Sequence, residues 1–403
     1  MSLAAGQQRT FLRLLLQLRP HWRNDLALPA RIQALLARNR SFGSSDRRLY
    51  RELIYTTLRY LPWIEPLMDG EPERAVRAAA WLAADLPPVR RLRAALLPDW
   101  PPCPPTVTER AAFLGATAGV LPEWFRAHCP EAFQPEETDA LLARAPLWLR
   151  LQGEEIGNIA KVAAEFDARG WSWQRSEVVS SAFRLPADAD ATKTDAYREG
   201  RIEVQDLGSQ LVLESIGIEP GGRWLDACAG AGGKSLQLAT LLGVDGHVDA
   251  HDVRAEALAE LARRAERGRF RNITPLTTPP SGDYDGVLVD APCSGSGTWR
   301  RAPHLKWTTT PGQIEEQGRR QLALLGKFGA HVRPGGRLVY ATCSLSRREN
   351  QEVAAAFLAT QPDFAPEPLG RTFGFSSRRG ELTVLPARHE TDGFFVASFR
   401  RRR

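Results

Sequence analysis

Cysteine and lysine are scarce in this chain of 403 residues, and long apolar runs are missing. The five cysteines are too few and too scattered for a disulfide framework, and none forms a C-x-x-C pair of the kind that holds structural zinc. No stretch reaches the roughly 18 apolar residues of a membrane span. The N-terminal stretch carries arginines among its apolar residues, unlike a secretory signal. We therefore expect a soluble, cytoplasmic protein with no membrane or metal partner, and we expect a monomer.

Basic residues, nearly all of them arginine, outnumber acidic ones. Only five of the 53 basic residues are lysines, and the net charge is +6. Arginine presents a planar fork that matches phosphate groups, so a basic, arginine-rich surface favours a nucleic-acid partner. With 43% apolar and 25% charged residues, the chain has the composition of a folded protein with a real core.

The spacing of apolar residues divides the chain into three parts. Apolar residues recur at three- and four-residue intervals through residues 1–140, which predicts an all-helical domain. Residues 141–200 combine two strand patterns with one helical pattern, which predicts a small α/β linker subdomain. From 201 to 403, strands alternate with helices, a pattern typical of a doubly wound, mostly parallel sheet.

A glycine-rich loop, DACAGAGGKS, follows one of these strands and opens a helix, so its backbone N–H groups can approach a ligand. Asp252 ends the next strand, about 20 residues further on, where a carboxylate commonly binds a ribose. The loop and this acid together indicate a ligand that contains a nucleoside. A glycine turn that only packs strand against helix is the alternative.

Two cysteines follow the carboxyl ends of two later strands. DAPCSGSG carries Asp290 and Cys293, and YATCS carries Cys343. Adjacent strands lie about 5 Å apart, so both thiols are expected to face one cleft. The sequence SLSRREN predicts that a helix starts beside Cys343, which favours a nucleophilic thiolate there. Free cysteines are more often inert core residues, which is the alternative interpretation.

Three motifs, DACAGAGGK, DAPCSGSGTWRRAPHLKW and YATCSLSRREN, resemble those that define the Sun/NOP2 family of RNA 5-methylcytosine methyltransferases. The stretch SDRRLYRELIYTTLRYLPWIEPLM is similar to the NusB-like helical domain of bacterial members that methylate a cytosine in 16S ribosomal RNA. The resemblance implies a Rossmann-like methyltransferase domain with a mostly parallel seven-stranded sheet over residues 201–403. It also implies that residues 1–140 form a NusB-like, RNA-binding domain.

The resemblance implies roles for individual residues as well. Cys343 is the expected nucleophile, Cys293 is expected to assist product release, and Asp290 to contact the target cytosine near the cofactor. The cofactor S-adenosylmethionine is expected to bind Asp290, to bind Asp252 through its ribose, and to lie along the glycine loop formed by Cys228, Ala229, Gly230, Ala231, Gly232, Gly233 and Lys234. The sequence departs from the family where an acid usually stands near the adenine, because Thr277 or Thr278 occupies that place.

The segment that follows DAPCSGSG is expected to bind RNA, by contacts to phosphate and by stacking. The residues concerned are Arg300, Arg301, Lys306 and Trp307. The alternative is a solvated basic loop with a packed tryptophan.

The residue types suit methylation of cytosine C5, which is too poor a nucleophile to react unaided. A thiolate that adds to C6 pushes electrons to C5, and an acid near N3 stabilises the charge. The base must leave its stack to enter such a site. Three alternatives stay open: the same chemistry on transfer RNA, an N-methyltransferase acting on exocyclic amines, and a non-catalytic RNA-binding assembly factor. DNA cytosine-C5 methyltransferases place their nucleophile in the motif of the fourth strand, which here is Cys293.

Overall fold

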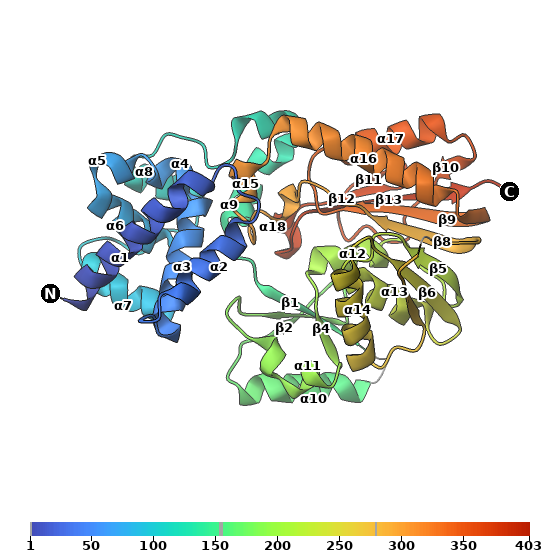
Figure 1. Cartoon of the computed structure of the whole chain (residues 1–403), viewed down its shortest axis with the longest axis horizontal. Coiled ribbons are helices and arrows are strands. Elements are labelled where there is room, and N and C mark those ends of the chain that lie inside the picture. Colours follow the sequence, from blue (N-terminus) through green and yellow to red (C-terminus); the bar gives the residue numbers. More distant parts are fainter. Residues whose placement is uncertain (1, 153–155, 279) are drawn as a thin grey trace. The chain divides into compact units, whose positions relative to one another are not determined.

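The computed structural model describes residues 2–152, 156–278 and 280–403, and the chain folds into two compact units (Figure 1). One unit comprises residues 1–144 together with 298–311, and the other comprises 145–297 together with 312–403. Within the described residues, no helix combines the length and the apolar character needed to cross a bilayer.

The first unit is helical, as the apolar spacing predicts. Leu15, Leu53 and Val76, from three different helices, are fully buried in one shared core cluster. Proline occupies the first turn of several helices, where its missing N–H costs no hydrogen bond. The helices are α1 (Leu3–Leu18), α2 (Leu28–Arg38), α3 (Ser44–Arg59), α4 (Leu61–Ile64), α5 (Leu67–Gly70), α6 (Pro72–Leu82), α7 (Pro87–Leu96), α8 (Val107–Leu114), α9 (Pro135–Leu142) and, from the later segment, α15 (Leu305–Thr308).

A small antiparallel sheet begins the second unit, with the strand order β2-β3-β1-β4. The predicted two strands and helix are present as β1, β3 and α10, and two short strands extend the sheet. This sheet shares its compact unit with the larger sheet that follows. Its elements are β1 (Leu147–Leu151), α10 (Ile156–Ala168), β2 (Gln174–Arg175), β3 (Ala182–Leu185), α11 (Asp195–Arg198) and β4 (Ile202–Val204).

The larger sheet contains nine strands among the described residues, in the order β11-β12-β13-β9-β8-β5-β6-β7, with β10 paired to β13. Strands β9, β8, β5, β6 and β7 are parallel neighbours, whereas every pairing that involves β10 to β13 with a neighbour is antiparallel. The predicted number of seven strands is therefore wrong, and half of the pairings are antiparallel. Strands β10 and β11 span only three and two residues, too few to show an alternating pattern.

The strands of this sheet are β5 (Gly222–Asp226), β6 (Gly246–His251), β7 (Ile273–Leu276), β8 (Tyr284–Asp290), β9 (Val332–Thr342), β10 (Phe364–Pro366), β11 (Ser377–Arg378), β12 (Glu381–Val384) and β13 (Phe394–Arg401). The helices between them are α12 (Leu207–Glu214), α13 (Gly233–Leu242), α14 (Ala255–Arg267), α16 (Pro311–Gly329), α17 (Gln351–Thr360) and α18 (Pro386–His389).

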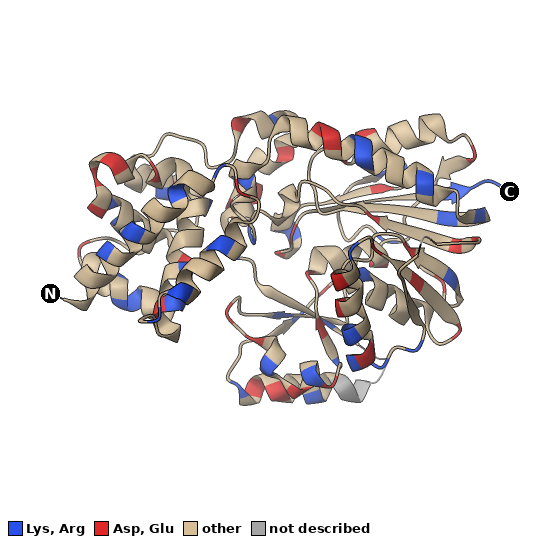
Figure 2. Cartoon of the chain, in the orientation of Figure 1, with Lys and Arg blue, Asp and Glu red and all other residues tan. Residues whose placement is uncertain are grey.

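Both faces of the larger sheet are covered by helices, which explains why its central strands are apolar throughout. Alternate residues point to opposite faces of a strand. Trp224 and Leu288 pack in the cluster that contains α12 and α13, and Leu225 and Val287 pack in the cluster that contains α16 and α17. Figure 2 shows basic and acidic positions interspersed along the helices of both units.

Candidate active site

The two predicted thiols lie side by side at the carboxyl ends of β8 and β9. These strands pair in parallel, with Asp290 opposite Ala341, so the residues that follow them leave the sheet together. The Sγ atoms of Cys293 and Cys343 are 3.4 Å apart. Gly297 permits this arrangement, because a Cβ atom there would lie 2.8 Å from Cys343 O and 2.1 Å from Gly393 O. The two predicted thiols therefore meet at this edge of the sheet.

The pKa of Cys293 is raised well above its ordinary value. The hydrogen bond with Cys343 is the largest cause, and burial and the nearby Glu349 carboxylate raise the pKa further. Cys293 therefore favours its protonated thiol form. The predicted helix start beside Cys343 is wrong, because α17 begins only at Gln351, after a turn in which Arg347 and Arg348 are exposed.

Glu349 joins the two cysteine loops, and the sequence analysis did not single it out. Its fully buried carboxylate accepts hydrogen bonds from Ser294 N at 2.7 Å, Ser294 Oγ at 2.5 Å and Ser344 Oγ at 2.6 Å. Ser294 follows Cys293 and Ser344 follows Cys343, so one side chain holds the residue after each thiol. No local pattern in the sequence marks Glu349, because its partner Ser294 on the other loop is 55 residues away.

We expect Glu349→Gln to disturb the thiol pair while the protein stays folded. An amide cannot accept on its nitrogen side, so at least one serine contact must reverse or break, at a cost of about 1–3 kcal/mol. Loss of the charge should also lower the pKa of Cys293, whose thiol should then react faster with iodoacetamide near neutral pH. Glu352→Gln is the matched control, because Glu352 is an exposed acid paired with Arg348. Equal alkylation rates in the two variants would contradict this assignment.

The glycine loop runs from the end of β5 to the start of α13. Gly232 has a φ of 87°, and a Cβ atom there would lie 2.6 Å from Leu261 Cγ, so only glycine fits. At Gly233 a Cβ would meet nothing within 4 Å, so open space lies beside the first turn of α13. A helix N-terminus facing open space suits an anionic group such as an amino-acid carboxylate. These features fit S-adenosylmethionine.

Asp252 lies at the end of β6 and already holds the glycine loop. Oδ2 accepts from Gly230 N at 2.8 Å, and Arg254 donates to both oxygens through its backbone and its guanidinium at 2.9–3.0 Å. Burial acts to raise the pKa of Asp252, but the hydrogen bonds from Arg254 and Gly230 outweigh it and lower the pKa. A ribose can reach this carboxylate when the Arg254 side chain, which is 66% exposed, moves aside.

Asp290 is held by Lys234 at the head of α13. Lys234 Nζ donates to Asp290 Oδ2 at 2.9 Å and to Ser209 Oγ at 3.0 Å, and it lies 4.9 Å from the Phe394 ring centre. Lys234 is buried whereas the Asp290 side chain is 31% exposed. The carboxylate is therefore fixed in orientation yet open to a ligand. Across the described ranges, no cluster of three or more His, Cys, Asp or Glu side chains has the arrangement of a metal site.

Asp226, the first residue of the DACAGAGGKS motif, ends β5. It is fully buried, and Ser235 Oγ donates to its Oδ2 at 2.7 Å. Burial raises the pKa of Asp226 to about 7, against the effect of Ser235, and the charge of Asp290 contributes to the increase. Through Ser235, Asp226 is hydrogen-bonded to the first turn of α13, which follows the glycine loop.

Thr277 and Thr278, predicted near the adenine, are exposed after β7, and Pro279 beside them lies outside the described residues.

The loop predicted to grip RNA phosphate is packed into the helical unit instead. Arg300 and Lys306 are 3% and 1% exposed, so the prediction that they contact RNA is wrong for both side chains in this conformation. Lys306 Nζ donates to Arg59 O at 2.7 Å and to Val120 O at 3.2 Å. Arg300 O accepts a hydrogen bond from the Arg59 guanidinium at 3.2 Å.

Tryptophans complete this packing. The Trp307 indole N–H donates to Leu58 O at 2.6 Å, and Trp299 is fully buried with its ring 4.6 Å from that of Phe125. Trp307 is therefore a packed tryptophan, as in the alternative interpretation, while Arg301 is exposed. The sequence does not reveal these contacts, because the partners lie more than 170 residues away along the chain.

Burial of Lys306 predicts a specific pH dependence of stability. Burial lowers the pKa of Lys306 well below its ordinary value, and the nearby Arg59 adds to this effect. The Lys306 amine then binds its proton more tightly in the unfolded chain than in the folded protein. Between its folded and unfolded pKa values, the free energy of unfolding therefore rises as the pH rises. In denaturant titrations between pH 7 and 10, the wild type should gain up to ~1.4 kcal/mol per pH unit relative to Lys306→Met. A constant difference across this range would show that the buried amine does not titrate in this way.

Comparisons with known proteins agree with this geometry. Residues 214–400 match a family model described as 16S rRNA methyltransferase RsmB/F. The chain is 33% identical over 306 residues to ribosomal RNA small subunit methyltransferase B of Cronobacter sakazakii. The aligned region covers 71% of this chain and 68% of that protein. The chain is 31% identical over 303 residues to the probable ribosomal RNA small subunit methyltransferase B of Bacillus subtilis, with the same shares.

Solved structures show the same fold. A methyltransferase homologue from Pyrococcus horikoshii has a TM-score of 0.59 at 26% identity, over 69% of this chain and 93% of that chain. NSun6 from the same organism, solved with SFG, has a TM-score of 0.61 at 18% identity, over 70% of this chain and 97% of that chain.

Proposed function

Since the chain belongs to the RsmB/F family of 16S rRNA methyltransferases, which depend on S-adenosylmethionine, we propose that it methylates C5 of a cytosine in 16S ribosomal RNA. The observation that carries the C5 assignment is the contact between the Cys293 and Cys343 thiols at 3.4 Å, beside the ends of two parallel strands. Methylation of an exocyclic amine needs no thiol, because the amine nitrogen itself attacks the methyl group.

In the proposed reaction, Cys343 attacks C6 of the cytosine, and its lone pair forms the C6–S bond. The ring electrons move towards N3 and C5, and Asp290, oriented by Lys234, faces the charge that develops on the ring. S-adenosylmethionine, when bound, supplies the methyl group that C5 takes up. Breaking the C6–S bond then requires loss of the C5 proton to a base or water and return of the electron pair to Cys343.

Cys293 fits the release step because it is the protonated partner. As the C6–S bond breaks, negative charge returns to the Cys343 sulfur, which lies within hydrogen-bonding distance of Cys293. A thiol that keeps its proton can donate to this leaving group and so favour elimination. Glu349 positions both thiols through the serine that follows each of them.

The cofactor is proposed to lie along residues 228–234, with its ribose at Asp252 and its reacting end towards Asp290. Open space at Gly233 and the exposed part of Asp290 support this placement. We also propose that the helical unit, whose sequence resembles a NusB-like domain, binds RNA. This unit also includes residues 298–311, which follow the Cys293 loop directly in the sequence.

Nucleoside analysis tests the proposed reaction. We expect purified protein to convert unmodified 16S rRNA transcript and S-adenosylmethionine into RNA that contains 5-methylcytidine at one position, read by mass spectrometry and bisulfite sequencing. An N4-methylcytidine product would exclude the C5 reaction. Methylation of a transfer RNA transcript in preference to 16S rRNA would change the substrate but retain the chemistry.

A further inference from the structure

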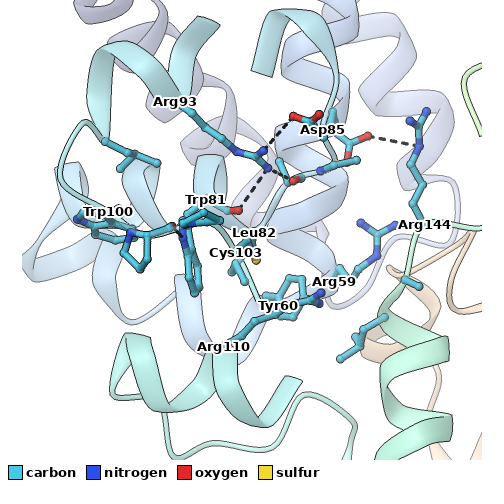
Figure 3. A pocket seen from close by; sticks show the side chains of 18 of the residues that line it. Arg59, Tyr60, Trp81, Leu82, Asp85, Arg93, Trp100, Cys103, Arg110 and Arg144 are labelled. Carbon is cyan, nitrogen blue, oxygen red and sulfur yellow. Dashed lines mark hydrogen bonds and ion pairs between the residues drawn. The ribbon is translucent and has the colours of Figure 1, made fainter. Parts of the chain in front are cut away.

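A cavity of about 710 Å³ lies within the helical unit, away from the thiols in sequence (Figure 3). Residues of α3, α6 and α7 line it, together with the proline-rich stretch 97–103 and the residues that follow α9. Its size falls in the range of small-molecule sites, roughly 300–1,000 Å³. No part of the proposed methylation mechanism uses this cavity.

The cavity carries an excess of positive charge. Four guanidinium groups line it, from Arg59, Arg93, Arg110 and Arg144, against the two carboxylates of Glu52 and Asp85. Figure 3 shows these arginines arranged around the cavity. Asp85 lies 3.4 Å from Arg93 but is shared with Arg90, which lies outside the lining, and Glu52 lies 3.6 Å from Arg144. The carboxylates therefore compensate only part of the charge.

Two of the arginines are also bound to the backbone. Arg93 donates to Ala80 O, Trp81 O and Ala83 O. Arg110 donates to Pro104 O, to Pro105 O and to the Tyr60 hydroxyl. These two side chains hold the walls of the cavity, but carbonyl oxygens do not neutralise their charge.

Of the two lining arginines that form no ion pair among the described residues, Arg59 and Arg110, Arg59 is the more deeply buried. It is only 7% exposed, its Nε has no hydrogen-bond partner, and among the described residues it forms no ion pair. Its one side-chain hydrogen bond goes to Arg300 O. Burial lowers the pKa of Arg59, and the neighbouring arginines Arg144 and Arg110 act in the same direction against Glu52. Buried charges in proteins are normally paired, so this site favours an anion.

Packed aromatic rings form one wall of the cavity. Trp81 is only 2% exposed, its ring centroid lies 4.5 Å from that of Phe113, and its indole N–H donates to Pro101 O. Trp100 packs edge to face against Trp81, with ring centroids 5.9 Å apart, and Arg77 lies over the Trp100 ring. This wall is rigid, and the arginine forks beside it match phosphate oxygens.

We propose that this cavity binds a phosphate group of the RNA substrate at Arg59 and Arg144. The identity of the partner as RNA rests on the proposed function. The same phosphate chemistry also describes a free nucleotide, and the experiment below separates the two sources.

Two exposed alanines on α7 provide a matched test. Ala94 lines the cavity, whereas its neighbour Ala95 is exposed but does not. In filter binding of the full-length protein to an unmodified 16S rRNA transcript, without cofactor, Ala94→Glu should raise the Kd about tenfold, because a carboxylate replaces an anion-accepting surface. Ala95→Glu should change the Kd less than about twofold, since it adds the same charge outside the cavity. Ala94→Lys should tighten binding and increase the slope of log Kd against log salt by about one.

Equal effects of Ala94→Glu and Ala95→Glu, or no effect of either, would overturn the proposal. Micromolar binding of AMP that Ala94→Glu abolishes, with rRNA affinity unchanged, would assign the cavity to a free nucleotide and also overturn it. The binding assay contains no cofactor and involves no methyl transfer. Failure of the C5 reaction would therefore leave its outcome unaffected, and failure here would leave the C5 reaction standing.

Discussion

Cys293→Ala should still attack and methylate its RNA and then stall, leaving a protein–RNA conjugate that survives denaturing gel electrophoresis. The variant retains Cys343, so the C6–S bond forms, but the leaving thiolate loses its neighbouring donor at 3.4 Å. The conjugate should require S-adenosylmethionine, because elimination after methyl transfer is the step that fails. Turnover should fall to a single round per enzyme molecule.

Cys343→Ala should behave differently, with no methylation and no conjugate under any condition. Removing the attacking sulfur leaves C5 without the electron density that it needs to take a methyl group. Both variants should keep their affinity for S-adenosylmethionine, measured by calorimetry, which separates loss of chemistry from loss of fold. A conjugate with Cys343→Ala and none with Cys293→Ala would exchange the two roles.

Asp252→Ala should weaken binding of S-adenosylmethionine by about 30- to 150-fold, the equivalent of ~2–3 kcal/mol for charged hydrogen bonds to a ribose. The loss has a second origin in this chain, because Asp252 Oδ2 also holds Gly230 N of the glycine loop. Calorimetry on the folded variant measures the effect. Unchanged affinity would place the ribose elsewhere.

Two controls sharpen the Asp252 result. Arg254→Ala should leave affinity equal or tighter, because the exposed guanidinium occupies lone pairs of Asp252 that the ribose would use. Thr277→Ala and Thr278→Ala should each change affinity by less than about tenfold, since a neutral hydroxyl contributes only a modest hydrogen bond. A larger loss at either threonine would show that it replaces the missing acid near the adenine.

Local patterns in the sequence predicted most of what positions the site. The alternation of strands and helices after residue 201 is confirmed, and so is the helical character of the N-terminal part. Parallel strands that end together explain why Cys293 and Cys343 meet, and the glycine at position 232 fits a turn that no other residue allows. Each of these features depends on residues close in sequence or on a general property of parallel sheets.

The features that were missed depend on contacts between distant segments. Lys306 and Trp307 were predicted to bind RNA because a local pattern cannot show their partners. These partners, Arg59 O and Leu58 O, belong to helices some 250 residues earlier in the chain. Glu349 was not singled out from the sequence, because its partner Ser294 lies on a distant loop across the site. Short antiparallel strands near the C-terminus are defined by their pairing, β10 with β13 and β11 with β12, rather than by any pattern of their own.

The central claim, that Cys343 adds to C6 of a cytosine whose C5 is methylated, is tested most directly with RNA that contains 5-fluorocytidine. Fluorine at C5 cannot leave as a proton, so the wild-type enzyme should be trapped after methyl transfer as a covalent complex. Digestion and peptide mass spectrometry should then find the methylated nucleotide on the peptide that contains Cys343. A nucleotide on the Cys293 peptide, or no covalent complex in the presence of S-adenosylmethionine, would contradict the account.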